Sequence, residues 1–237
     1  YTEDASSAAS DVYKRQEPFS SLDQAMRTQL RGEVRQILRD ARQSAIFVTH
    51  DQGEALTVAD KVAVMTRGRV LQVAAPEIIY AEPATPYVAT FVGVSNLVPA
   101  EVDGGIAVTR FGTVRLIGES ARLVRVHAMC LLRPEHFSIE EAPDGPANAD
   151  AWEVIDRRFS GSEILLELRS RDGEQLWVEA GGRVRHLGLG DHVAVRLRDV
   201  ETVAFGRKPS AAPEPPVRSV PPGAAEPEPA DSEVPLG

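Results

Sequence analysis

Residues 44–74 read SAIFVTHDQGEALTVADKVAVMTRGRVLQVA, and this stretch sets the fold class of the first part of the chain. Ser44–Thr49 contains a short continuous apolar run of the kind found in parallel strands that are buried on both faces. Asp51–Val58 is predicted to be a short helix, and Lys61–Thr66 and Arg69–Ala74 are predicted to be strands joined by a tight turn. Alternation of strands and helices indicates an α/β piece.

The same piece extends in both directions from this stretch. Upstream, a capping-box start at Ser21 precedes apolar residues that recur at helical spacing over Leu22–Ala41, which predicts an amphipathic helix. Downstream, Glu77–Tyr80 and Pro86–Val92 are predicted to be two further helical segments, each beginning at or just after a proline. The α/β piece is therefore expected to end near Gly93.

Beyond Gly93 the pattern changes to short strands separated by turn signals such as Asp103–Gly104 and Asp172–Gly173. This pattern favours one or two small β-barrels over residues 94–206. Trp152 and Trp177 lie on predicted strands, and we expect them in the barrel core. The predicted strands are 101–103, 106–109, 113–117, 123–127, 129–132, 137–140, 152–159, 163–169, 175–179, 192–197 and 201–205.

The two ends of the chain differ from these parts in composition. Residues 1–16 are polar and aperiodic, and SDVYKRQ at Ser10–Gln16 resembles a vector or adapter remnant, so an unstructured, non-native leader is expected. Residues 207–237 hold nine of the seventeen prolines together with Ala, Glu and Ser. Such a segment cannot bury enough apolar surface to offset chain entropy, so we predict a disordered tail.

The overall composition excludes several classes of protein. With 26 basic and 35 acidic residues the net charge is −9, which disfavours a nucleic-acid partner because phosphates are neutralised by clustered Lys and Arg. The single cysteine, Cys130, lies in an apolar run and is predicted to be a buried reduced thiol. No apolar run is long enough for a membrane span. Four histidines are scattered without ligand spacing, so no metal site is predicted from them: His127, His136, His186 and His192.

Several motifs then resemble one family. EPFSSLD at Glu17–Asp23, followed by a helix, IFVTH and DQGEAL, resembles the region after the Walker B strand of ABC transporter ATPases. Residues 64–93 resemble the exit from that domain in importers for sugars, polyamines, sulfate or ferric iron. LRPEHFSIE within Leu131–Glu140 and FSGSEILLELRSRDGEQLWVEA at Phe159–Ala180 resemble the transport-associated, oligonucleotide-fold (TOBE) domain of the same subunits.

The resemblance implies a fold and three site residues. Residues 17–93 would be the C-terminal part of an ABC nucleotide-binding domain, and residues 94–206 would be an all-β, OB-like barrel domain. Glu17 would hold the attacking water in line with the γ-phosphate. His50, at the carboxyl end of a strand where α/β sheets bind ligands, would contact the γ-phosphate. Asp23 would belong to the loop that crosses to the second ATPase subunit.

Other elements of such an ATPase are missing from the sequence. The phosphate-binding loop G-x-x-x-x-G-K-[ST] and an LSGGQ-like signature are absent, and Gln16 stands where a magnesium-positioning aspartate is expected. We therefore expect a truncated sequence fused to a foreign leader. The apolar faces of the Leu22–Ala41 helix and the Ala45–Val48 strand are expected to be uncovered, and this chain alone is expected neither to bind ATP tightly nor to hydrolyse it.

The expected function is that of the ATP-binding (ATPase) subunit of an ABC-type importer. The complete protein would use ATP and Mg²⁺ and work as a homodimer on the cytoplasmic face of two membrane permease subunits, served indirectly by an external solute-binding protein. The alternative is a free-standing β-barrel module that binds a small oxyanion or a regulatory protein, with residues 17–93 as packing support. Oligonucleotide binding is disfavoured because no basic groove with interleaved aromatic residues is evident.

Overall fold

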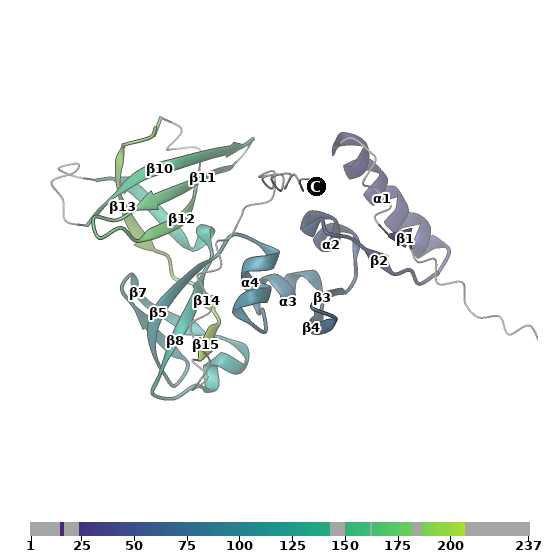
Figure 1. The fold of residues 1–237 in the computed structure, drawn as a ribbon, viewed down its shortest axis with the longest axis horizontal. Coiled ribbons are helices and arrows are strands. Elements are labelled where there is room, and N and C mark those ends of the chain that lie inside the picture. The colour runs from purple at the N-terminus through teal and green to yellow at the C-terminus, as the bar shows by residue number, and fades with distance from the viewer. Residues whose placement is uncertain (1–14, 17–23, 143–149, 162, 182–185, 207–237) are drawn as a thin grey trace, which may run out of the picture. The chain divides into compact units, whose positions relative to one another are not determined.

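The computed structural model describes residues 15–16, 24–142, 150–161, 163–181 and 186–206, which Figure 1 draws as a coloured ribbon. The described chain is mostly β-strand with a few helices. It divides into two compact units. The first unit holds the described residues up to Val92 together with Leu97–Leu131 and residues 200–206, and the second holds Gly93–Asn96 and the described residues of Leu132–Asp199.

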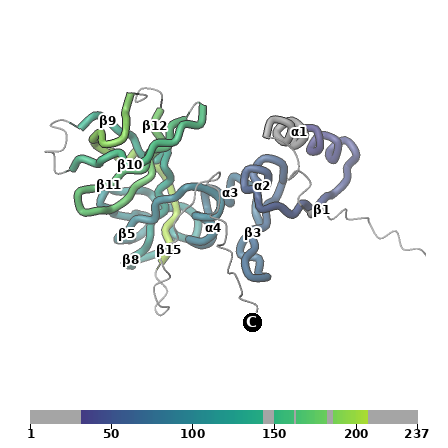
Figure 2. Tube along the Cα trace, turned by 45° about the horizontal axis from the view of Figure 1, so that its top comes forward, coloured from purple at the N-terminus to yellow at the C-terminus, as the bar shows by residue number. Residues whose placement is uncertain are grey.

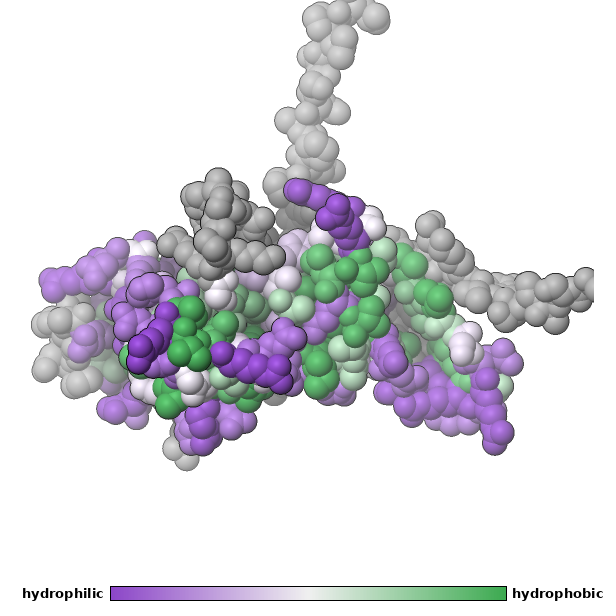
Figure 3. Space-filling view, turned by 90° about the horizontal axis from the view of Figure 1, so that it is seen from below, coloured by the Kyte–Doolittle hydropathy of each residue, from purple (hydrophilic) through white to green (hydrophobic). Residues whose placement is uncertain are grey.

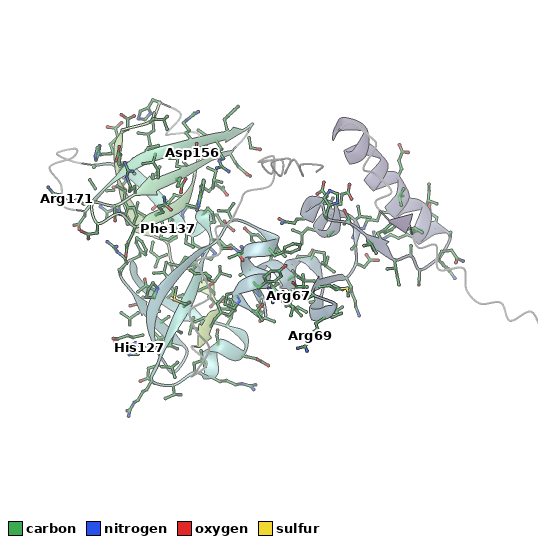
Figure 4. All side chains as sticks on the ribbon, in the orientation of Figure 1. Arg67, Arg69, His127, Phe137, Asp156 and Arg171 are labelled. Carbon is green, nitrogen blue, oxygen red and sulfur yellow. The ribbon has the colours of Figure 1, made fainter. Side chains whose placement is uncertain are left out.

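The first unit opens with the α/β piece. Its elements lie where the sequence predicts them, except for a two-residue strand at Arg15–Gln16, within the leader that was expected to be unstructured. They are β1 Arg15–Gln16, α1 Gln24–Asp40, β2 Phe47–Val48, α2 Gln52–Val58, β3 Val62–Thr66, β4 Arg69–Ala74, α3 Pro76–Ala81 and α4 Pro86–Val92. β1 and β2 pair in parallel, and β3 and β4 form an antiparallel hairpin. Arg67 and Gly68 turn this hairpin with φ angles of 47° and 73°, the left-handed values that a tight two-residue turn needs. Figure 4 shows Arg67 and Arg69 at the tip of the hairpin.

The β3–β4 hairpin is apolar on both faces, but only one face is packed. Val62 and Val64 join Ile79 of α3 and Val88 of α4 in a buried cluster. The other face carries the cross-strand pairs Ala63–Val73 and Met65–Val70. Three of these side chains are exposed large hydrophobics: Met65 at 56%, Val70 at 53% and Val73 at 57%.

Apolar side chains are also exposed on α1 and at β2. The relative exposure of Ile37 is 64%, that of Ile46 is 59% and that of Val48 is 45%. Figure 3 shows apolar surface gathered in patches on one face of the molecule. The expectation that the apolar faces of the first helix and strand are uncovered is confirmed for these residues. Contiguous exposed apolar surface of this kind marks an interaction site or an aggregation hazard.

A six-stranded sheet follows, in the order β14-β7-β6-β5-β8-β15. Its strands are β5 Asn96–Asp103, β6 Ile106–Thr109, β7 Gly112–Leu116, β8 Val126–Leu132, β14 Glu201–Thr202 and β15 Ala204–Gly206. The chain therefore returns at residues 201–206 to complete a sheet that it began a hundred residues earlier, and β15 runs beside β8 in Figure 2. Ala89 of α4 packs with Leu131 and Val203 on this sheet.

Two strand assignments from the sequence were wrong. Residues 201–205 form not one strand but parts of two, because β14 pairs in parallel with β7 whereas β15 pairs antiparallel with β8. Residues 123–127 and 129–132 do not form two strands, because a single strand, β8, runs from Val126 to Leu132. Arg125 has a left-handed φ of 50°, which interrupts the extended backbone directly before Val126, where the strand begins. The prediction of a break at Ala128 overlooked that this small residue lies on the buried face of one continuous strand.

The second unit holds a five-stranded sheet in the order β12-β11-β10-β13-β9. Its strands are β9 Phe137–Glu141, β10 Ala151–Ser160, β11 Glu163–Arg169, β12 Gln175–Ala180 and β13 His192–Leu197. β10 pairs with β13 at Ala151–Glu153 and with β11 from Glu153 to Ser160, and a bulge between Val154 and Asp156 shifts the register with β11. The edge strands β12 and β9 also contact each other. Trp152 and Trp177 are buried, as predicted.

The free edge of β12 is capped by a side chain. Asn96 is 7% exposed, and its Oδ1 accepts a hydrogen bond of 2.8 Å from the backbone N–H of Trp177. Its Nδ2 donates a second bond of 2.8 Å to the Trp177 carbonyl. The amide thus takes the place of a peptide group of a neighbouring strand and satisfies two groups that an edge strand leaves unpaired. The guanidinium of Arg158 covers the Trp177 ring at 4.9 Å.

We predict that Asn96→Ala lowers the free energy of unfolding by about 2 to 4 kcal/mol, because it leaves a buried donor and a buried acceptor unsatisfied. Urea unfolding followed by tryptophan fluorescence measures the change. Gln175→Ala, which removes an exposed amide from the start of the same strand, serves as the control and should cost less than about 0.5 kcal/mol. Equal midpoints for the two variants would show that the Asn96 bonds contribute nothing.

Candidate functional site

His50 lies where the sequence places a ligand-facing residue. It lies two residues after the end of β2 and directly before Asp51, the N-cap residue of α2, and its side chain is exposed. β2 pairs in parallel with β1, so His50 stands at the carboxyl end of a parallel pair. That end is where open α/β sheets bind their ligands.

Hydrogen bonds fix the backbone on both sides of His50. Asp51 accepts the backbone N–H of Glu54 at 3.0 Å, which caps the first turn of α2. The hydroxyl of Thr49 donates to Oε2 of Glu54 at 2.7 Å and accepts the backbone N–H of Asp51 at 2.9 Å. Sequence reasoning missed Thr49 and Glu54 as supporting residues, although the Asp51–Glu54 spacing is that of a capping box and could have indicated them.

The other two predicted site residues, Glu17 and Asp23, lie outside the described residues. The nearest described position is Gln16 on β1, whose Cα is in register with that of Val48 on β2. The strand that leads to Glu17 therefore pairs with the strand that leads to His50. The roles of Glu17, Asp23 and His50 stay predictions.

In the second unit, the RPEH part of the predicted TOBE motif forms a buried clamp. The Arg133 side chain is 2% exposed. Its Nη1 donates to the carbonyls of Gly93 and Val94, each at 3.2 Å, and to the hydroxyl of Ser95. A buried cation is tolerated only when such polar partners surround it, and here Nη1 shares its two N–H groups among three acceptors. Sequence reasoning missed this role, because the partners lie about forty residues away.

His136 belongs to the same turn, the short helix η2 at Pro134–His136. Its Nδ1 accepts the backbone N–H of Arg133 at 3.2 Å, a bond that only the neutral ring can accept. Burial lowers the pKa of His136 below its ordinary value of 6.5, opposed by the carboxylate of Glu135 and assisted by the charge of Arg133. The folded unit therefore favours neutral imidazole.

A groove of about 530 Å³ lies over the neighbouring strands β6, β5 and β8 of the first unit. Its lining is mostly apolar, with two ionisable residues, Glu101 and His127, the latter labelled in Figure 4. An oxyanion site is normally built from arginines or converging backbone N–H groups. Among the lining residues only His127 could carry a positive charge, and Glu101 opposes it, so the groove offers little to an oxyanion. The lining residues are Pro99, Ala100, Glu101, Val108, His127, Ala128 and Met129.

Three further features bear on function. Cys130 is buried, and burial raises the pKa of its thiol to about 12, which makes it unreactive, as predicted for a structural thiol. In the part of the chain that the structure describes, no group of three or more His, Cys, Asp or Glu side chains could hold a metal ion. None of the described helices is long and apolar enough to cross a membrane.

Comparisons with known proteins bring these observations together. The TOBE domain family matches residues 130–205. The Fe(3+) ions import ATP-binding protein FbpC of Haemophilus influenzae is 34% identical over 182 residues, which cover 76% of this chain and 51% of that protein. The FbpC 1 protein of Rhodococcus jostii is 38% identical over 186 residues, with 76% and 51% covered. The sulfate/thiosulfate import ATP-binding protein CysA of Ralstonia nicotianae is 35% identical over 207 residues, with 81% and 54% covered.

The chain spans about half the length of the curated relatives that it matches. Among solved structures, the cytoplasmic molybdate-binding protein ModG with molybdate bound covers 47% of this chain and 96% of its own, at 10% identity and a TM-score of 0.36. That likeness is too low to support an argument. The sequence matches, by contrast, show homology to ABC importer ATP-binding subunits across most of the chain.

We predict that acidification destabilises the second unit through His136. A histidine whose folded pKa lies below 6.5 binds more protons when unfolded, so stability is highest above pH 6.5 and falls as the pH drops through the folded-state pKa. Urea unfolding at pH 7 and pH 5 should show a smaller loss for His136→Asn, whose side-chain oxygen can still accept the Arg133 N–H, than for the unmodified chain. The exposed His127 supplies the matched control, since His127→Asn should leave the pH dependence unchanged. A pH dependence that His136→Asn leaves intact would contradict the assignment.

Proposed function

Because the chain is homologous to ATP-binding subunits of ABC importers and contains a TOBE domain, we propose that it is the C-terminal part of such a subunit. The observation that carries the proposal is the extent of the homology. A match over 76% of the chain is longer than the TOBE match of residues 130–205 and so includes other parts of the sequence. A free-standing TOBE module would not require that additional similarity.

The proposed domain organisation follows the sequence expectations. Residues 17–93 are the C-terminal part of the nucleotide-binding domain, and residues 94–206 form the TOBE region with an OB-like barrel. The contact between the edge strands β12 and β9 supports this, because a five-stranded, partly open barrel brings its edge strands together. The expected leader, apart from the short strand β1, and the expected tail at residues 207–237 lie outside the described residues.

This chain's own residues do not suffice for ATP and Mg²⁺. The sequence lacks the lysine-bearing phosphate loop, and its position before Glu17 is the neutral Gln16 rather than a carboxylate. We therefore propose that the remaining part of the complete protein supplies the phosphate loop and the signature motif. ATP and Mg²⁺ then belong to the complete subunit, where they supply the phosphoryl-transfer chemistry.

Within that subunit, the residues of this chain have positioning and contact roles. Glu17 orients the attacking water, and His50 donates a hydrogen bond to the γ-phosphate from the carboxyl end of β2. Asp23 lies in the loop that contacts the second ATPase subunit. The complete protein works as a homodimer, peripheral on the cytoplasmic face of the membrane, where it drives two permease subunits that receive solute from an external binding protein.

A hybrid protein tests this proposal. The N-terminal part of the Haemophilus influenzae relative is placed before Glu17, with aspartate in the position of Gln16. We expect Mg²⁺-dependent ATP hydrolysis that Glu17→Gln and His50→Ala each slow by roughly 100-fold or more, with nucleotide binding largely retained, because such residues act as a unit in the transition state.

Phosphate release and calorimetry measure turnover and binding separately. His127→Ala, at an exposed histidine in the first unit, is the control and should hydrolyse ATP at the normal rate. The 237-residue chain alone should show neither tight binding nor turnover. Near-normal hydrolysis by both Glu17→Gln and His50→Ala would refute the site assignment, and turnover by the chain alone would refute the proposed need for the remaining part.

A further inference from the structure

Glu54 is an unusual residue to find buried. It is 6% exposed at the third position of α2, and glutamate is among the residue types that are least often buried. Burying a carboxylate costs free energy unless hydrogen bonds compensate for the lost water. One such bond comes from the Thr49 hydroxyl at 2.7 Å, from the residue directly before His50. The buried carboxylate of Glu54 therefore bonds to a residue on the N-terminal side of His50, although Glu54 itself lies on the C-terminal side.

The hydroxyl of Thr49 links two bonds into a relay. It donates to Glu54 and accepts the backbone N–H of Asp51, the residue directly after His50. In a capping box, the third helical residue receives the N–H of the N-cap residue itself. Here a hydroxyl is inserted between the two, so the box is extended by one residue and encloses the backbone of His50.

The Asp51 side chain closes the ring. Its Oδ1 accepts the backbone N–H of Glu54 at 3.0 Å. A Cβ added to Gly53 would lie 3.2 Å from that same oxygen, which is tighter than an ordinary contact. The turn that carries His50 is thus held by Thr49, Asp51 and Glu54 and leaves little room beside Asp51, while the imidazole stays exposed.

We propose that Thr49 and Glu54 are positioning residues for His50, which hold its backbone so that the imidazole meets the γ-phosphate at the correct place. The inference rests on the proposed function of His50. The effect of Thr49 and Glu54 is on geometry, and small misplacements of a contact group reduce the rate of the chemical step far more than they reduce substrate binding.

Paired substitutions in the hybrid protein test the proposal. Thr49→Val removes the hydroxyl with little change of shape, whereas Thr49→Ser keeps it, and Glu54→Ala removes the acceptor, whereas Glu54→Gln keeps an acceptor oxygen. We expect Thr49→Val and Glu54→Ala to lower kcat by about 10- to 100-fold with KM for ATP changed less than about twofold. Thr49→Ser and Glu54→Gln should retain most of the activity.

Thr57→Val is the matched control, because Thr57 is an exposed threonine on the same helix and takes no part in the ring. It should leave kcat unchanged. Amide hydrogen exchange on the 237-residue chain adds a readout that needs no ATP: the N–H groups of Asp51 and Glu54 should exchange faster in Thr49→Val but not in Thr49→Ser or Thr57→Val. If Glu54→Ala lowers the melting temperature of the protein, the comparison of Thr49→Val with Thr49→Ser decides the outcome.

The possible failures are distinguishable. Slow hydrolysis by His50→Ala together with normal kcat in Thr49→Val would overturn this inference and leave the proposed function intact. Unchanged exchange at Asp51 in Thr49→Val would overturn it independently of any activity. Normal hydrolysis by His50→Ala would overturn the proposed function and this inference with it.

Discussion

The second unit depends on hydrogen bonds that satisfy its buried polar groups. Several of these bonds converge on the short segment Gly93–Asn96. Arg133 binds the carbonyls of Gly93 and Val94 and the hydroxyl of Ser95, and the Asn96 amide pairs with both backbone groups of Trp177. Through these hydrogen bonds the segment contacts the turn before β9 and the edge strand β12. Without them, a buried cation and an open strand edge would be left in the core of the unit.

The first unit presents the opposite situation, because apolar surface there is not covered. The outer face of the β3–β4 hairpin, with Met65, Val70 and Val73, is as apolar as the packed face. Strands that are apolar on both faces are typical of the buried sheets of α/β domains. The homologous importer subunits are about twice as long as the matched region, so they contain enough additional chain to bury such a face. Under the proposed function, one feature explains both the exposed surface and the absence of a phosphate loop from the sequence: the part of the subunit that this chain does not span.

Local pattern predicted much of the fold, since turn signals and strand periodicity located nearly all the strands and the position of His50 after β2. It failed at Val126, because the left-handed backbone at Arg125 leaves no mark in side-chain periodicity. It also missed Arg133 and Asn96, whose partners lie about forty and eighty residues away, since a local pattern carries no information on such pairs. Glu54 is intermediate: its spacing from Asp51 was visible in the sequence, but its burial and its bond to Thr49 were not.

The central claim is that this chain is the C-terminal part of an importer ATP-binding subunit, and sequencing the genomic DNA immediately upstream of the codon for Glu17 tests it most directly. The account predicts an open reading frame, continuous with Glu17, that encodes a phosphate-binding loop, a signature motif and an aspartate directly before Glu17. An authentic start codon before Tyr1, with no such frame upstream, would contradict it and favour a free-standing module.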